Sequence, residues 1–342
     1  MKYNFSSSLS GRKLAPYLIG LWWLLVIFIA AMSWGGFKYG NVGGRLLGQP
    51  TLVDSRWILS LVIYFGGLFL FYIGVLLQLF FVVKYTLEAV SVRDSAFETD
   101  YDFGRYATMV VWGALLSAIT CGIYLPWFLT RLIRFFADGT SHRFNLFSFG
   151  GRAMTLFGIT VLLVLLPSVV IEGFGITYML TVAQLSPESV TSLTSLWIVL
   201  LSLLYMLFIC VYQVLAMRWA IDFGYGNRRI ALKMPWWSAS WFLLGQTFLS
   251  TITLGLYLPV FVLRWNRYCL THAVLGQELV EERFGMLLRP WRDWGFVWCQ
   301  MLLSFVTLGI YYPWAYAKIV NRFVPRCSLD EIDSPSEEMP AE

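Results

Sequence analysis

Long apolar runs separated by short polar stretches dominate the chain. Four of these runs are unbroken and cover residues 17–37, 57–83, 153–171 and 195–217. Each has the roughly 20 residues that a helix needs to cross a bilayer at about 1.5 Å per residue. The pattern therefore predicts four membrane-spanning helices, with Pro167 placed to kink or end the third of them.

Three further apolar segments end in nearly the same phrase. Aligned on a shared proline, they are SAITCGIYLP (117–126), STITLGLYLP (250–259) and SFVTLGIYYP (304–313). Basic and aromatic residues follow each proline at equivalent distances. So many matches in three places predict internal repeats, near residues 106–136, 236–269 and 294–324.

The shared phrase predicts a helix, a corner and a second helix. Glycine suits the C′ position that ends a helix, because it adopts a left-handed conformation without strain. Proline cannot continue that helix, but it can begin another at N1. The threonine before each glycine can bond back to a carbonyl of the preceding turn. The predicted corner residues are Gly122 and Pro126, Gly255 and Pro259, and Gly309 and Pro313.

The helix after each corner is amphipathic and basic, so we expect it to lie in the headgroup layer. The helix before each corner is only just shorter than a full span, which leaves two arrangements open. With seven spans, Lys and Arg divide into 14 cytoplasmic and 11 external residues. With four spans and three re-entrant segments, only Lys38, Arg45 and Arg56 lie outside, and both termini are cytoplasmic. The positive-inside rule favours the second arrangement.

Re-entrant backbone has to be buried by protein, because lipid cannot satisfy its polar groups. We therefore expect the three corners to converge and pack around the long spans. Gln246 and Gln300 precede two of the corners and can hydrogen bond across helices, whereas Gly113 takes the matching place before the first.

Composition agrees with a membrane location. The chain is 58% hydrophobic and only 13% charged, against about 25% charged residues in a soluble domain. Its net charge of +5 suits anionic lipid and not nucleic acid. Five scattered cysteines without a CxxC pair predict no disulfide framework, metal site or cofactor. The expected fold is an all-α polytopic membrane protein, with one membrane domain over residues 1–327 and an acidic disordered tail over 328–342.

The ITLGIYLPW-like phrases, each followed by a basic and aromatic helix, resemble the hallmark of the YjgN-like bacterial inner-membrane family (domain of unknown function 898). The stretch FNLFSFGGR, residues 144–152, is similar to that family's connector after the basic helix. The resemblance covers residues 95–325. It implies a multi-pass protein of the bacterial inner membrane, and it implies no activity and no catalytic residues.

Candidate chemistry outside the corners is sparse. His142 and His272 follow two of the basic helices and are predicted to be surface histidines in loops. The acidic run ETDYDF, residues 98–103, is predicted to be a solvated linker, and Glu172 is expected to mark the outer end of the third span. No hydrolase, zinc-protease, P-loop or dinucleotide motif is present, so an enzyme ranks last among the functions considered.

The basic residues after the corners are the best functional candidates. They are Arg131, Arg264 and Lys318, with Arg134, Arg267 and Arg322 further along. They can anchor topology alone, which needs the fewest assumptions, or they can bind phosphate headgroups of anionic lipids. The leading hypothesis is transport or handling of a lipid or small apolar substrate, because internal repeats and broken helices are typical of transporters. The alternative is a non-transporting scaffold or assembly partner, and the sequence does not indicate an oligomeric state.

Overall fold

The computed structural model describes residues 2–20, 23, 26, 55–92, 95–182, 187–277 and 280–332. These residues fall into two compact units, one built from residues 2–4, 126–294 and 326–332 and the other from residues 5–125 and 295–325. The helices, after a first helical stretch over residues 11–20, are α3 (Ser55–Ala89), α4 (Phe103–Ile119), α5 (Leu125–Asp138), α6 (Ala153–Thr160), α7 (Leu166–Val182), α8 (Pro187–Ala220), α9 (Trp236–Ile252), α10 (Leu258–His272), α11 (Pro290–Val306) and α12 (Tyr312–Phe323).

Three helices in the described part of the chain are long and apolar enough to cross a membrane. They are Phe65–Ala89, Ala153–Gly175 and Val199–Ala220. They correspond to three of the four predicted spans, whereas most of the predicted span over residues 17–37 lies outside the described residues. The protein is therefore a helical membrane protein, and a fourth long span is not established.

The third predicted span passes Pro167 without ending. A single turn of π-helix, Val161–Leu165, joins α6 to α7 just before the proline. Such a turn shifts the backbone bonding where proline cannot donate a hydrogen bond. Glu172 is exposed on α7, three residues before the candidate span ends at Gly175, while the helix itself continues to Val182.

The all-α prediction is wrong, because short strands connect the helices. The described residues form eleven strands: β1 (Lys2–Ser7), β2 (Val90–Val92), β3 (Ser95–Ala96), β4 (Glu98–Thr99), β5 (Thr140–His142), β6 (Asn145–Phe149), β7 (Asp222–Tyr225), β8 (Arg228–Leu232), β9 (Ala273–Gln277), β10 (Val280–Met286) and β11 (Cys327–Ile332). In the first unit, neighbouring strands pair antiparallel in the order β1-β11-β10-β9-β8-β7-β6-β5. In the second unit, residues 5–7 of β1 pair with β2, which pairs with β3.

Two sequence assignments change because of these strands. The start of the predicted disordered tail forms β11, while residues 333–342 lie outside the described residues. The acidic run predicted as a linker contains β4, and its Asp102 caps α4 by accepting a hydrogen bond of 2.9 Å from the Gly104 backbone N–H. A carboxylate at this position satisfies one of the unpaired donors at a helix start.

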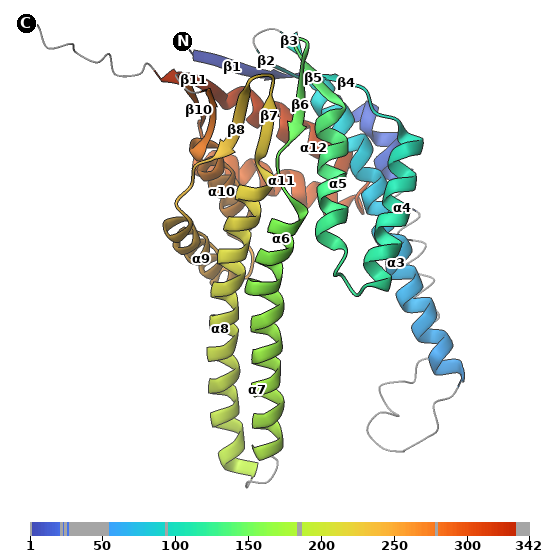
Figure 1. The fold of residues 1–342 in the computed structure, drawn as a ribbon, viewed down its shortest axis with the longest axis vertical. Helices are drawn as coiled ribbons and strands as arrows, with labels where there is room; N and C mark the ends of the chain where they lie inside the picture. The colour runs from blue at the N-terminus through green and yellow to red at the C-terminus, as the bar shows by residue number, and fades with distance from the viewer. Residues whose placement is uncertain are drawn as a thin grey trace, which may run out of the picture. The chain divides into compact units, whose positions relative to one another are not determined.

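The first unit gathers its strands at one end of its long helices (Figure 1). The helix formed by α6 and α7 leaves this end after β6, and α8 returns to it before β7. Strands β6 and β7 are neighbours, with Phe149 opposite Phe223. Phe149 also packs edge-on against Trp219 at the end of α8, so sheet and helices share one apolar core.

The second unit has its own core. Leu9, Leu14 and Leu18 of the N-terminal segment pack with Ala317 of α12, and with Val82 and Tyr85 of α3 at its edge. The Asn321 side chain makes two hydrogen bonds to the Leu9 backbone. It accepts one from the Leu9 N–H at 2.9 Å and donates one to the Leu9 carbonyl at 2.8 Å.

Candidate functional site: two helical hairpins

The three glycine–proline corners have the same backbone geometry. In each, the glycine N–H bonds to the serine carbonyl five residues earlier, at 2.7, 2.8 and 2.7 Å. The residue before the glycine bonds to the carbonyl three residues earlier, which completes a Schellman motif. Gly122, Gly255 and Gly309 have φ of 88°, 85° and 83°. They therefore occupy C″, one position later than predicted.

The C′ position at each corner holds a residue with a side chain. Cys121, Leu254 and Leu308 have φ of 50°, 49° and 49°, in the left-handed region that non-glycine residues rarely adopt. The prolines stand at the second position of the next helix, not the first. Both adjustments leave the predicted sequence of helix, corner and helix in place.

A threonine side chain connects the two helices at every corner. The hydroxyls of Thr120, Thr253 and Thr307 donate to a carbonyl four residues earlier, at 2.7, 2.9 and 2.8 Å. The same oxygens accept from the backbone N–H of Tyr124, Tyr257 and Tyr311, at 3.0, 3.2 and 3.1 Å. The back-bonding predicted from the sequence is confirmed, and the second bond supplies an acceptor to an N–H at the start of the next helix.

The corners are not buried in protein, contrary to the expectation that protein covers them. Leu254 is 94% exposed and Leu308 is 70% exposed. Further exposed apolar side chains flank them, namely Ile252, Leu256, Phe305 and Val306. The backbone polar groups of the corner are satisfied locally by the Schellman bonds and the threonine, so they do not need a protein cover.

The second corner joins α9 and α10 into a hairpin that begins and ends at two paired strands. The chain enters from β8 and leaves into β9, and Leu232 stands opposite Ala273 in these neighbouring strands. The Lys233 N–H also donates to the His272 carbonyl at 2.9 Å. We call residues 236–272 the second hairpin.

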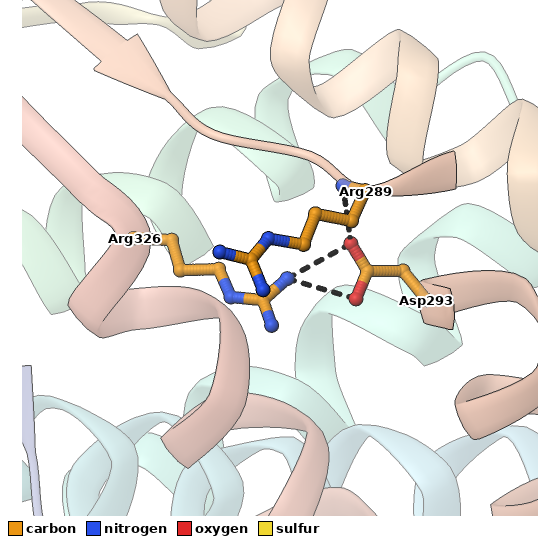
Figure 2. Close-up of polar contacts among 3 residues, drawn as sticks. All are labelled: Arg289, Asp293 and Arg326. Carbon is orange, nitrogen blue, oxygen red and sulfur yellow. Dashed lines mark hydrogen bonds and ion pairs between the residues drawn. The ribbon is translucent and has the colours of Figure 1, made fainter. Parts of the chain in front are cut away.

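The third corner joins α11 and α12 into a hairpin whose ends are also held together (Figure 2). Asp293 at the start of α11 is 0% exposed. Its carboxylate accepts from one guanidinium nitrogen of Arg326, at 2.8 and 2.9 Å, and from the Arg289 backbone N–H at 2.8 Å. Met286 and Cys327 on either side are paired in β10 and β11. We call residues 290–323 the third hairpin.

A polar bridge crosses each of these two hairpins. In the second, the Arg264 guanidinium donates to the Tyr257 hydroxyl at 2.8 Å, and that hydroxyl donates to Gln246 Oε1 at 2.7 Å. In the third, Lys318 Nζ donates to the Tyr311 hydroxyl at 2.8 Å, and the hydroxyl donates to Gln300 Oε1 at 2.9 Å. Gln246 and Gln300 thus bond across helices as anticipated, with the corner tyrosine as their partner.

The remaining predicted basic residues have different surroundings. Arg131, Arg134 and Arg267 are exposed on α5 and α10. The Arg322 guanidinium lies 4.1 Å from the centre of the Phe296 ring, on the preceding helix of its own hairpin. The equivalent contact in the second hairpin is a stack of Phe242 on Tyr268, at 4.8 Å. Arg322 therefore corresponds structurally to Tyr268 and not to Arg267.

Ion pairs on the strands stabilise the end of the first unit where the hairpins begin. Arg228 on β8 pairs with the buried Glu282 of β10 at 2.9 Å. Arg229 donates to both oxygens of Asp222 on β7, at 2.7 and 2.8 Å, and this contact raises the pKa of the guanidinium further above its ordinary value. Both pairs start on β8, the strand that leads into the second hairpin.

Comparison with known families settles the relationship suggested by the corners. Residues 14–286 match the family described as bacterial protein of unknown function, DUF898. The chain belongs to this family. The match begins well before residue 95 and ends before the third corner, so it includes the N-terminal region that resembles the family only loosely by eye. No curated protein and no solved structure matches the chain.

Of the two histidines of this DUF898 protein, His142 is not a surface residue, whereas His272 is partly exposed. His142 is buried on β5, and its Nδ1 lies 2.9 Å from the Tyr225 hydroxyl. His272 is partly buried at the end of α10, with Nδ1 2.8 Å from the Tyr268 carbonyl. Within the residues that the structure describes, no three His, Cys, Asp or Glu side chains gather as metal ligands would.

Proposed function

We propose that this protein handles a lipid or small apolar substrate in one membrane leaflet. In this proposal, the second and third hairpins dip into that leaflet from the side on which the strands lie. The observation that carries the proposal is the combination of exposed apolar corners with hairpin ends that return to neighbouring strands. Exposed apolar side chains of this size favour hydrocarbon over water, by about 25 cal/mol per Å² of surface transferred.

The pairing of the strands supports a definite membrane topology. Open sheet edges do not occur in hydrocarbon, so strands that hydrogen bond to one another belong on one side of the bilayer. Helices α6 to α8 lie between the neighbours β6 and β7, and they therefore cross the membrane an even number of times. Of 25 Lys and Arg residues, only Lys38, Arg45 and Arg56 lie in the predicted outer loops. We therefore propose that the strands and both termini face the cytoplasm of a bacterial inner membrane.

The depth proposed for the second hairpin follows from its contacts with α8. The shared apolar cluster uses α8 residues from Met206 to Met217 together with Leu243 of α9 and Phe261 of α10. The part of α8 further from the strands has exposed side chains, namely Val199, Leu200, Leu203 and Leu204. The hairpin thus covers the half of α8 nearest the strands, as expected for a segment that enters one leaflet and returns.

The substrate class follows from what the spanning helices contain. Residues 65–83, 153–171 and 199–217 include no Asp, Glu, Lys or Arg. Ion pathways through membranes use such residues, so an apolar or lipid substrate suits these helices better than an ion.

Lipid transfer in reconstituted vesicles tests the proposal. Replacing the two exposed corner leucines (Leu254→Asp with Leu308→Asp) puts carboxylates where hydrocarbon is expected, without disturbing a packed core. Leu287→Asp is the control, because Leu287 is as exposed as Leu308, at 70%, but lies beside the strands. We expect protein-dependent transfer of a fluorescent phospholipid to be lost in the corner variant and kept in the control. Equal rates for the wild-type protein and protein-free vesicles would refute lipid handling.

A membrane scaffold is the second candidate, and one observation favours it. Phe144 in the turn between β5 and β6 is fully exposed, beside the exposed Leu146. Such a pair on the strand side suits a protein partner. If the scaffold proposal is correct, crosslinking in cells should join this protein to a partner, and Phe144→Ser should abolish that crosslink. Lipid transfer should then be absent.

A further inference from the structure

Each of the two polar bridges ends in a cation. Arg264 and Lys318 stand seven residues after their corner tyrosines, and both are exposed. The glutamine stands eleven residues before the tyrosine in each hairpin, and the four bridge distances fall between 2.7 and 2.9 Å. Two hairpins therefore hold a positive charge at the same place by the same means.

The one carboxylate in the two hairpins is already paired with another residue. Residues 236–272 contain no Asp or Glu, and within residues 290–323 the only one is Asp293, which pairs with Arg326. Tyrosine hydroxyls solvate the two cations but do not neutralise them. Among the described residues, no carboxylate lies within ion-pair distance of Arg264 or Lys318.

The surroundings make an external anion favourable. Leu256 and Val262 in the second hairpin, and Leu308 and Tyr312 in the third, are exposed and mostly apolar. A cation among lipid-facing side chains is costly unless an anion accompanies it. Phosphate groups are the abundant anions at a membrane surface, and each nearby cation contributes about 1 kcal/mol toward an anionic leaflet.

We infer that the second and third hairpins each bind the phosphate group of one anionic lipid, through Arg264 and Lys318 respectively. Tyr257 with Gln246, and Tyr311 with Gln300, act as positioning residues that hold the cation beside the corner. One hairpin has arginine at this position and the other has lysine. Lysine cannot make the bidentate contact of arginine, so the shared feature is a single positive charge that attracts the phosphate. The inference rests on the proposed insertion of the hairpins and adds to it the ligand class and the binding residues.

The test counts phosphatidylglycerol molecules retained on the purified protein, by native mass spectrometry. Arg264→Gln and Lys318→Gln remove the charge but keep an N–H donor for the tyrosine, so the bridge can persist. We expect each single variant to retain one lipid fewer than wild type, and the double variant two fewer. Arg264→Lys and Lys318→Arg should retain the wild-type number, as should Arg283→Ala, which removes an exposed arginine from β10.

The outcomes separate this inference from the proposed function. A double variant that retains as much lipid as wild type would overturn the site, while insertion and transfer could still hold. If millimolar inorganic phosphate displaces the two lipids, the site binds free phosphate and the lipid assignment is wrong. If the wild-type protein retains no anionic lipid and transfers none, both the site and the proposed function fail.

Discussion

The Asp293 carboxylate and the Arg326 guanidinium meet at 2.8 Å across 33 positions of sequence, and they hold the two ends of the third hairpin together. Replacing Asp293 by Asn leaves the arginine without its buried counter-charge. Breaking one partner of such a pair costs about 3–5 kcal/mol. We therefore expect a large fall in the thermal unfolding temperature measured in detergent. Asp222→Asn, which breaks the more exposed pair with Arg229, should cost about 1 kcal/mol or less and serves as the control.

The left-handed corner glycines predict opposite effects for two nearby substitutions. Gly255→Ala places a side chain at φ 85°, although no atom crowds the new Cβ, so we expect a loss of about 1 kcal/mol from backbone strain alone. Gly245→Ala lies within α9, also in open space, and should stabilise by up to about 1 kcal/mol through helix propensity. Unfolding temperatures that move in the same direction for both variants would contradict the corner geometry.

The corner tyrosines make a prediction about the polar bridges. Tyr257→Phe or Tyr311→Phe removes the hydroxyl that links glutamine to the cation, at a cost of about 1 kcal/mol. A double-mutant cycle with Gln246→Leu should show that the Tyr257 and Gln246 effects are not additive. Tyr312→Phe is the control, since it stands next to Tyr311 and has no part in the bridge. Additive losses in the cycle would show that the bridge does not form.

Native Cys121 reports directly on the insertion of the first corner. It is exposed in the protein, and because the first corner has the same geometry as the other two, we expect it to lie in hydrocarbon as those two are proposed to do. In vesicles, a charged maleimide should label it slowly and a membrane-permeant maleimide should label it quickly. A cysteine placed at the fully exposed position 144 (Phe144→Cys), in a chain without Cys121, should react quickly with both reagents. Fast labelling of Cys121 by the charged reagent would rule out insertion.

Cys327 on β11 makes a prediction about pH. Burial raises the pKa of its thiol above the ordinary ~8.5. Because only the thiolate reacts, its labelling rate should keep increasing with pH beyond the point at which an exposed thiol levels off. Stopped-flow labelling of a variant whose one cysteine is Cys327 gives this pH profile. The comparison is the same chain with Cys327→Ser and Phe144→Cys, whose one cysteine is fully exposed. Identical pH profiles would mean that the thiol is not buried.

The spans and corners could be predicted from the sequence because their signals are local. About 20 consecutive apolar residues are enough to indicate a span, and a glycine followed by a proline is enough to indicate a corner. The one-residue error in placing Gly255 arose because C′ and C″ both have positive φ here, and Leu254 takes the first of them. A leucine at C′ cannot be foreseen from helix-capping preferences, which favour glycine there.

The strands could not be foreseen as easily, because each has only two to seven residues and several of them pair with partners far along the chain. One local signal was present: Gly226 and Asn227 form a tight turn between the short runs of β7 and β8. The polar bridges required more than spacing. Gln246 and Arg264 meet at Tyr257 only after α9 and α10 fold back on one another.

The pairing of Asn4 with Ser328 has a consequence for how the molecule is made. The ribosome delivers the helices to the membrane one after another, yet Ser328 emerges 324 residues after Asn4. Until then, residues 2–4 of β1 have an open strand edge. A truncated product that stops before β11 would keep its inserted helices but leave two strand edges, on β1 and β10, bare to chaperones and proteases.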